Sequence, residues 1–97
     1  MENKAKNYSR ELLGKTIVSK SGKKFGEVGD LIFEVNSGEL IHLLLQNPTI
    51  YTERLELEKT KNGEILIPFS AVIATGDFIV VAEEDIIWEG YNLVFFI

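Results

Sequence analysis

The residue types that could do chemistry in this chain are a glycine–lysine–threonine run, one histidine and a set of carboxylates. Gly14-Lys15-Thr16 matches the last residues of a phosphate-binding loop. That motif also requires a glycine at position 9, where Ser9 stands, and a helix directly after the loop. Here a β-branched stretch follows instead. We therefore expect no nucleotide site at this run.

Metal binding and acid–base catalysis both need partners that this sequence does not supply. His42 is the only histidine and there is no cysteine, so a metal there would rest on carboxylates alone. General acid–base work needs paired carboxylates in a cleft. The candidates instead alternate along exposed strand faces or lie in turns: Glu53, Glu56, Glu58, Glu64 and the run Glu83-Glu84-Asp85. We expect no catalytic residues, no metal and no cofactor, and hence no enzyme.

Charge is distributed unevenly along the chain. Residues 1–24 carry seven bases and two acids, whereas the whole chain has a net charge of −5. Four lysines of this segment form a candidate basic patch for RNA or an acidic partner: Lys15, Lys20, Lys23 and Lys24. Tyr8 is the only aromatic residue in residues 1–24. One aromatic side chain is too few for a base-stacking platform, which favours an ordinary solvated surface.

Several sequence features bear on the compartment. The lack of cysteine fits a reducing interior. The N-terminus lacks the apolar stretch of a signal peptide, and no run approaches the ~20 apolar residues of a membrane helix. We expect a soluble, cytoplasmic protein with no membrane span.

Turn-linked strands dominate the pattern, which predicts a small all-β domain. We expect a single helical turn at residues 9–14, capped by Ser9 and ended by Gly14 in the left-handed conformation. The expected strands cover residues 16–19, 24–35, 39–46, 54–59, 64–67 and 78–82, with turns at 36–38, 62–63 and 69–72.

The long strand 24–35 contains a change of phase. Every second residue along Leu31–Val35 belongs to one apolar face, and Phe25 shares its parity, but Val28 does not. An extra residue near Gly29-Asp30 would return Val28 to the buried face. The sequence therefore predicts a β-bulge or sharp bend there, of the kind that curls a sheet towards a barrel.

Two apolar segments are candidate interfaces. Strand 39–46 is apolar on both faces, so one face suits the core and the other a subunit contact through Leu40, His42 and Leu44. His42 would pack there, with a pH-sensitive dimer contact as a minor alternative. The C-terminal tail would either pack on its own barrel or pair with a second subunit, through the candidates Trp88, Tyr91, Leu93, Phe95 and Phe96.

From about residue 9 to residue 83 the chain resembles the PRC-barrel family. The resemblance rests on Leu13–Val18, Ser21–Leu31, Gly38–Leu40, Ile67–Val72 and Gly76-Asp77. This family includes the cytoplasmic domain of the photosynthetic reaction centre H subunit and the C-terminal domain of the ribosome maturation factor RimM. The resemblance implies a small, strongly bent antiparallel β-barrel that acts as an adaptor and has no shared catalytic residues. The single barrel is most similar to the short stand-alone forms common in archaea.

Together these features predict three parts: a flexible polar N-terminus (1–8), a PRC-like barrel (9–83) and an apolar extension for dimerisation or docking (84–97). We expect a non-catalytic protein-interaction module, a homodimer with a further protein partner. By family analogy it would act in ribosome-associated or cell-division assemblies. One alternative is an RNA- or ribosome-binding accessory that uses the basic N-terminal region, with strongly salt-dependent binding. Another is a small-ligand carrier with its site at the barrel mouth or between subunits.

Overall fold

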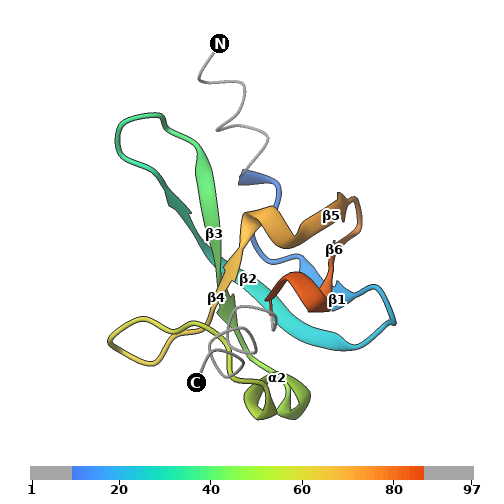
Figure 1. Cartoon of the computed structure of the whole chain (residues 1–97). Coiled ribbons are helices and arrows are strands. Elements are labelled where there is room, and N and C mark those ends of the chain that lie inside the picture. Colours follow the sequence, from blue (N-terminus) through green and yellow to red (C-terminus); the bar gives the residue numbers. More distant parts are fainter. Residues whose placement is uncertain (1–9, 87–97) are drawn as a thin grey trace.

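The computed structural model describes residues 10–86, which fold into one six-stranded sheet with two short helical elements (Figure 1). The strands are joined in the order β4-β3-β2-β1-β6-β5. All neighbours pair antiparallel except β1 and β6, which are parallel. The elements are β1 (Thr16–Ser19), β2 (Lys24–Phe33), β3 (Leu40–Gln46), α2 (Ile50–Arg54), β4 (Leu66–Pro68), the 3₁₀ helix η1 (Phe69–Ala71), β5 (Val72–Thr75) and β6 (Phe78–Val81).

The sheet is mixed and open, which corrects the expected closed antiparallel barrel while confirming a mostly β fold. Its two edge strands, β4 and β5, are separated in the chain only by η1. Three intervening residues can span little more than about 10 Å, so the sheet curls until its edges approach each other at η1. Within the described residues β4 and β5 do not pair with each other. The curl is therefore barrel-like but not closed.

The predicted bulge in β2 is confirmed. Val28 lies opposite Leu45 and Asp30 lies opposite Leu44, so Gly29 has no partner residue in β3. The extra residue turns Val28 inward, and Val28 and Phe25 are both fully buried.

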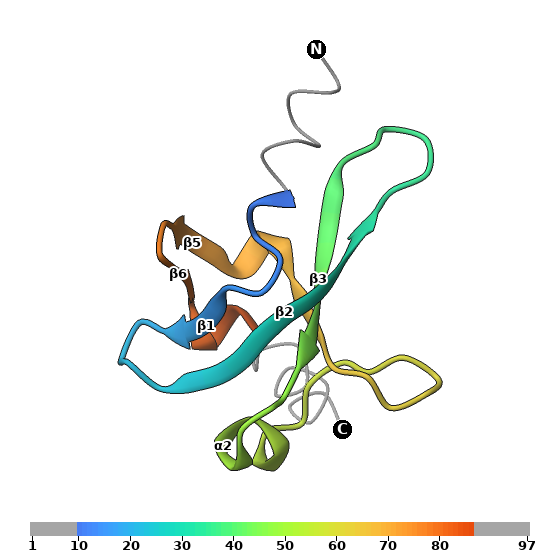
Figure 2. The same cartoon turned by 180° about the vertical axis from the view of Figure 1, so that it is seen from behind.

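The expected burial of Val35 is wrong, because β2 ends at Phe33 and Val35 is 93% exposed. Here the β2–β3 hairpin projects beyond the rest of the sheet (Figure 2). β1 pairs with β2 only as far as Glu27, and β4 pairs with β3 only from His42 onward. Within residues 10–86, no third strand covers the tip of this hairpin.

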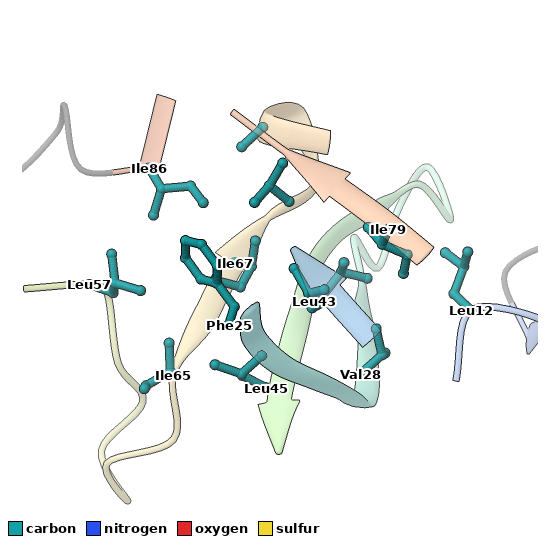
Figure 3. Close-up of a cluster of buried hydrophobic side chains, with 13 residues drawn as sticks. Leu12, Phe25, Val28, Leu43, Leu45, Leu57, Ile65, Ile67, Ile79 and Ile86 are labelled. Atoms are coloured by element: carbon teal, nitrogen blue, oxygen red, sulfur yellow. The ribbon is translucent and has the colours of Figure 1, made fainter. Parts of the chain in front are cut away.

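A single hydrophobic core lies inside the curl (Figure 3). Residues 83–86 form a helical turn, and Ile86 packs into the core. Part of the segment after the last strand thus contributes to the interior. The core side chains come from all parts of the sheet and its connections: Leu12, Ile17, Phe25, Val28, Leu43, Leu45, Leu57, Ile65, Ile67, Ala71, Ile79, Val81 and Ile86.

The predicted turns are largely confirmed. Gly14, Gly38 and Gly63 all have positive φ, at 83°, 75° and 85°. The N-terminal turn is closed by a bond from the Leu13 amide to the Arg10 carbonyl, while its expected cap, Ser9, lies outside the described residues. The turn expected at residues 69–72 is η1.

Residues 54–59 do not form the expected strand. Arg54 is the last residue of α2, residues 55–58 form no helix or strand, and Lys59 makes an isolated bridge to Ile65. Thr49 caps α2, since its side chain accepts a hydrogen bond from the Thr52 amide. The Thr52 hydroxyl, itself fully buried, donates to the Phe25 carbonyl at 2.7 Å. A tertiary contact thus stabilises a helix too short to persist alone.

Candidate functional site

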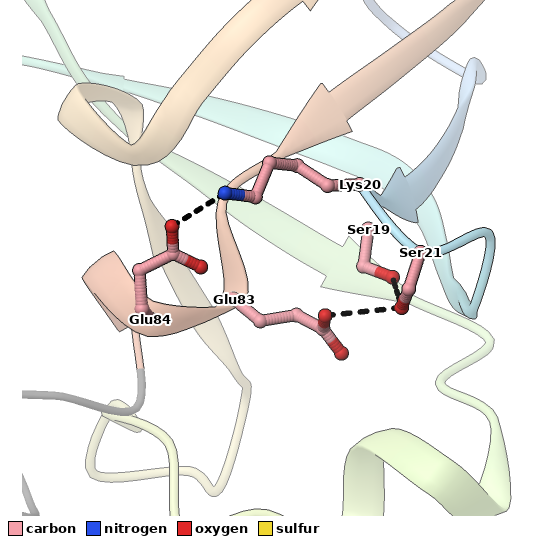
Figure 4. Close-up of polar contacts among 5 residues, drawn as sticks. All are labelled: Ser19, Lys20, Ser21, Glu83 and Glu84. Carbon is pink, nitrogen blue, oxygen red and sulfur yellow. Dashed lines mark hydrogen bonds and ion pairs between the residues drawn. The ribbon is translucent and has the colours of Figure 1, made fainter.

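A group of polar side chains among residues 10–86 ties the β1–β2 turn to α2 and to the segment after β6. Figure 4 shows the contacts between the turn and the segment after β6. The Ser21 hydroxyl donates to Glu83 Oε1 at 3.1 Å, and the Tyr51 hydroxyl donates to Glu83 Oε2. Ser19 and Ser21 share a hydrogen bond of 3.0 Å between their hydroxyls. We call Ser19, Ser21, Tyr51 and Glu83 the Tyr51 network.

Local structure explains why these side chains meet. Gly22, at φ 93°, allows the tight β1–β2 turn, in which the Ser19 amide donates to the Lys23 carbonyl. The Ser19 hydroxyl accepts from the Lys23 amide at 3.0 Å. Tyr51 stands on α2 with its ring edge-to-face against Phe25, at a centroid distance of 5.7 Å. The core therefore fixes the tyrosine and the turn fixes the serines.

The electrostatics of the network indicate a structural role. The hydrogen bond to Glu83, with burial and the Glu83 charge, raises the pKa of Tyr51 from 10.0 to about 12. The phenol thus stays protonated at neutral pH and cannot act as a base. Lys20 forms an ion pair of 2.6 Å with Glu84, which lowers the pKa of Glu84 and raises that of Lys20. The carboxylates of Glu83 and Glu84 thus both have hydrogen-bond or ion-pair partners within the domain.

The Tyr51 network predicts that raising the pH from 10 to 12 lowers the free energy of unfolding. In the unfolded chain Tyr51 ionises near pH 10, whereas in the folded protein it ionises near its raised pKa of about 12. This stabilisation is fully present below pH 10 and is lost as the pH rises through about 12. Urea denaturation across this range measures the slope, and Tyr51→Phe should flatten it. Equal slopes for the two proteins would refute the assignment.

The four lysines of the expected basic patch do not form one group. Lys15 and Lys20 flank opposite ends of β1, whose four residues span about 13 Å. The Lys15 ammonium donates to the Gly76 carbonyl at 2.5 Å, and Lys20 pairs with Glu84. The Lys23 ammonium lies 5.6 Å from the centre of the Tyr51 ring. Three of these four lysines thus make contacts within the domain, which favours a structural surface over a nucleic-acid site.

The expected interface on β3 divides between two faces. Leu40, His42 and Leu44 are all half-buried. The pairing of β3 with β2 skips Ile41, so Leu40 turns towards the core and packs against it, while His42 and Leu44 point to the outer face. His42 Nε2 lies 3.4 Å from Glu58 Oε1. The tail candidates Trp88, Tyr91, Leu93, Phe95 and Phe96 lie outside the described residues.

Sequence reasoning missed β5 and the apolar surface beside it. Ile73 on β5 is 53% exposed and Phe78 on β6 is 55% exposed. Three of the four residues from Val72 to Thr75 are β-branched, which was the available signal, but these residues follow a turn directly and are easily assigned to that turn.

Neither a metal cluster nor a spanning helix is present in the part of the chain that the structure describes. Residues 10–86 contain no group of three or more histidine or carboxylate side chains placed to hold a metal ion. None of their helices is long and apolar enough to cross a bilayer. The notable surface features of residues 10–86 are therefore the Tyr51 network and the exposed apolar side chains.

Comparison with known families agrees with this curled sheet and its turn glycines. The sequence model of the PRC-barrel domain family matches residues 5–85. The chain belongs to the PRC-barrel domain family. The match spans all six strands of this PRC-barrel domain, together with the residues of the Tyr51 network. No similar protein is found among curated proteins.

Proposed function

We propose that this PRC-barrel domain is a non-catalytic protein-interaction module that acts as a homodimer and binds a further protein. The observation that carries the proposal is the amount of large apolar side chain at its surface. Large apolar side chains that lie on neighbouring elements of a surface mark interaction sites, and Ile73 and Phe78 stand on the adjacent strands β5 and β6. Within residues 10–86 the exposed large apolar residues are Leu13, Val35, Ile41, Ile50, Ile73 and Phe78.

The polar groups support the same proposal. Catalysis needs titratable groups whose pKa values are tuned towards the working pH. The largest shift is that of Tyr51, and it moves the pKa away from neutrality, to about 12. The Tyr51 network and the Lys20–Glu84 ion pair join the segment after β6 to the β1–β2 turn. These groups suit a rigid scaffold that presents surfaces to partners.

The solution mass tests the proposal. Light scattering on the intact chain should give twice the 10.9 kDa mass of one chain. A second chain that ends at Ile86 retains every described core residue, and it should remain folded and dimeric, which leaves the apolar tail for a partner. A monomeric intact chain would contradict the homodimer. A truncated chain that is folded but monomeric would keep the homodimer and place its interface on the tail.

A further inference from the structure

The loop that leads into β4 carries the dipeptide Asn62-Gly63 at its tip. All four residues from position 61 to position 64 are exposed, and the loop, drawn in yellow, stands away from the sheet (Figure 1, Figure 2). Asn62 is the only asparagine of the chain that precedes a glycine. Exposed loop tips with small or polar residues are among the least protected parts of a folded chain. Water therefore reaches this dipeptide freely.

An asparagine that precedes glycine can react with its own backbone. The nitrogen of Gly63 would attack the side-chain amide carbon of Asn62, so that a C–N bond closes an imide ring and the side-chain nitrogen leaves as ammonia. Water, the only co-reactant, then opens the ring at either carbonyl carbon, which gives aspartate or isoaspartate. Glycine favours the attack because it has no Cβ to obstruct it and adopts a wide range of backbone conformations.

The fold of the loop leaves the Asn62 side chain free but restrains the nitrogen that would attack it. Within residues 10–86 the side-chain amide of Asn62 makes no hydrogen bond. The Gly63 amide donates to the Thr60 carbonyl at 3.0 Å. The Thr60 hydroxyl accepts from the amides of Asn62 and Glu64, each at 3.2 Å. The turn must open before the ring can close, and the bonds to Thr60 control how often it does.

The two other asparagines among residues 10–86 provide internal comparisons. Asn47 precedes Pro48, whose nitrogen carries no hydrogen to release, so the imide cannot form through the backbone. Asn36 is also exposed in a turn, but it precedes Ser37, whose side chain obstructs the attack and whose amide already donates to a carboxylate at 2.6 Å. Asn36 is therefore the matched comparison for Asn62.

We propose that Asn62 is a site of spontaneous deamidation, at which the folded protein acquires aspartate or isoaspartate. Either product adds a negative charge to a chain whose net charge is −5. Isoaspartate also inserts an additional carbon atom into the backbone of the turn, where Gly63 has φ +85°. The hydrogen bond from the Gly63 amide to the Thr60 carbonyl then spans a longer backbone and should weaken.

The effect should extend to β4, an edge strand of the sheet. The segment before the loop lies along β4, since Lys59 bridges to Ile65 and the Leu66 amide donates to the Glu58 carbonyl at 2.9 Å. The loop joins these two lengths of chain directly, so a lengthened turn should loosen both contacts. The inference is independent of the proposed function, because it concerns a single chain.

The test is mass spectrometry of the intact chain after long incubation at mildly alkaline pH, with fragmentation of its peptides to locate the change. The mass gain from replacement of NH2 by OH should build up at Asn62 at least about tenfold faster than at Asn36, equivalent to about 1.4 kcal/mol in activation free energy. Thr60→Ala should accelerate the reaction, because the hydroxyl that holds two amides of the turn is lost. The matched control is Lys61→Ala, since Lys61 is exposed in the same turn. Hydrogen exchange at the Leu66 amide should be faster in the modified protein.

The deamidation site is supported by a mass gain at Asn62 that exceeds the gain at Asn36 and that Thr60→Ala accelerates but Lys61→Ala does not. No gain at Asn62, or equal gains at Asn62 and Asn36, overturns the site. Equal rates in Thr60→Ala and Lys61→Ala overturn the control of the reaction by the turn. The readout is the mass of single residues, so a monomeric chain, which would contradict the homodimer, leaves this test intact.

Discussion

Replacement of Phe25 with alanine should lower the free energy of unfolding by about 3–5 kcal/mol, the usual cost of removing a large core aromatic ring. Phe25 is fully buried, and its ring contacts Tyr51 edge-to-face. Domains have a total stability of only about 5–15 kcal/mol, so the variant should be close to unfolding at room temperature. Urea denaturation followed by circular dichroism measures the loss.

Val35→Ala is the matched control for Phe25→Ala. It also removes apolar side-chain atoms from the β2–β3 region, but Val35 is 93% exposed and the change should stay within about 0.5 kcal/mol. A Phe25→Ala protein as stable as Val35→Ala would show that Phe25 is not the centre of the core.

Gly26→Ala should cost about 2–5 kcal/mol, because the site is strained for any side chain and has no room for one. Gly26 has φ +153°, a conformation that residues with a Cβ rarely adopt. An added Cβ would lie 2.8 Å from the Gln46 carbonyl oxygen and 3.1 Å from that of Asn47. Both contacts are with backbone, which cannot move away without disturbing β3. Denaturation by urea measures the effect.

Comparison with Gly38→Ala separates the two causes of the expected loss in Gly26→Ala, which are backbone strain and the lack of space for a Cβ. Gly38 also has positive φ, at +75°, but nothing lies within 4 Å of the position of its added Cβ. Only conformational strain remains, and the cost should be about 1 kcal/mol. Equal losses at the two glycines would contradict the close approach of β2 and β3 at Gly26.

Local patterns in the sequence were sufficient to predict most of the strands and turns of the sheet. The parity change between Val28 and Leu31 predicted the bulge at Gly29, because placing both residues on one face requires one unpaired position between them. Asn62-Gly63 and Gly38 marked turns through the conformations that glycine allows. These features depend on neighbours in the chain, so they can be read from the chain.

The errors concern contacts between distant residues. α2 depends on the hydrogen bond from Thr52 to the Phe25 carbonyl, which no local pattern reveals. The parallel pairing of β1 with β6 is equally non-local. At the candidate site, Lys15 and Lys20 appeared free in the sequence, but their partners lie 61 and 64 positions away. Ile41 has no partner residue in β2, and this irregularity places Leu40 and His42 on different faces. It follows from the pairing of β2 with β3 and not from the sequence of β3 alone.

The parallel pair of β1 and β6 also affects how the protein emerges from the ribosome. β1 comprises residues 16–19, yet one of its two neighbours is made of residues 78–81. During synthesis the β1–β2–β3 meander therefore appears first, with the future β6 side of β1 unpaired. Contacts between such distant residues close late and slow folding, because the entropy of a long loop must be lost first. The nascent domain can complete its sheet only after residues 78–81 have been translated, and until then β1 is open to mispairing.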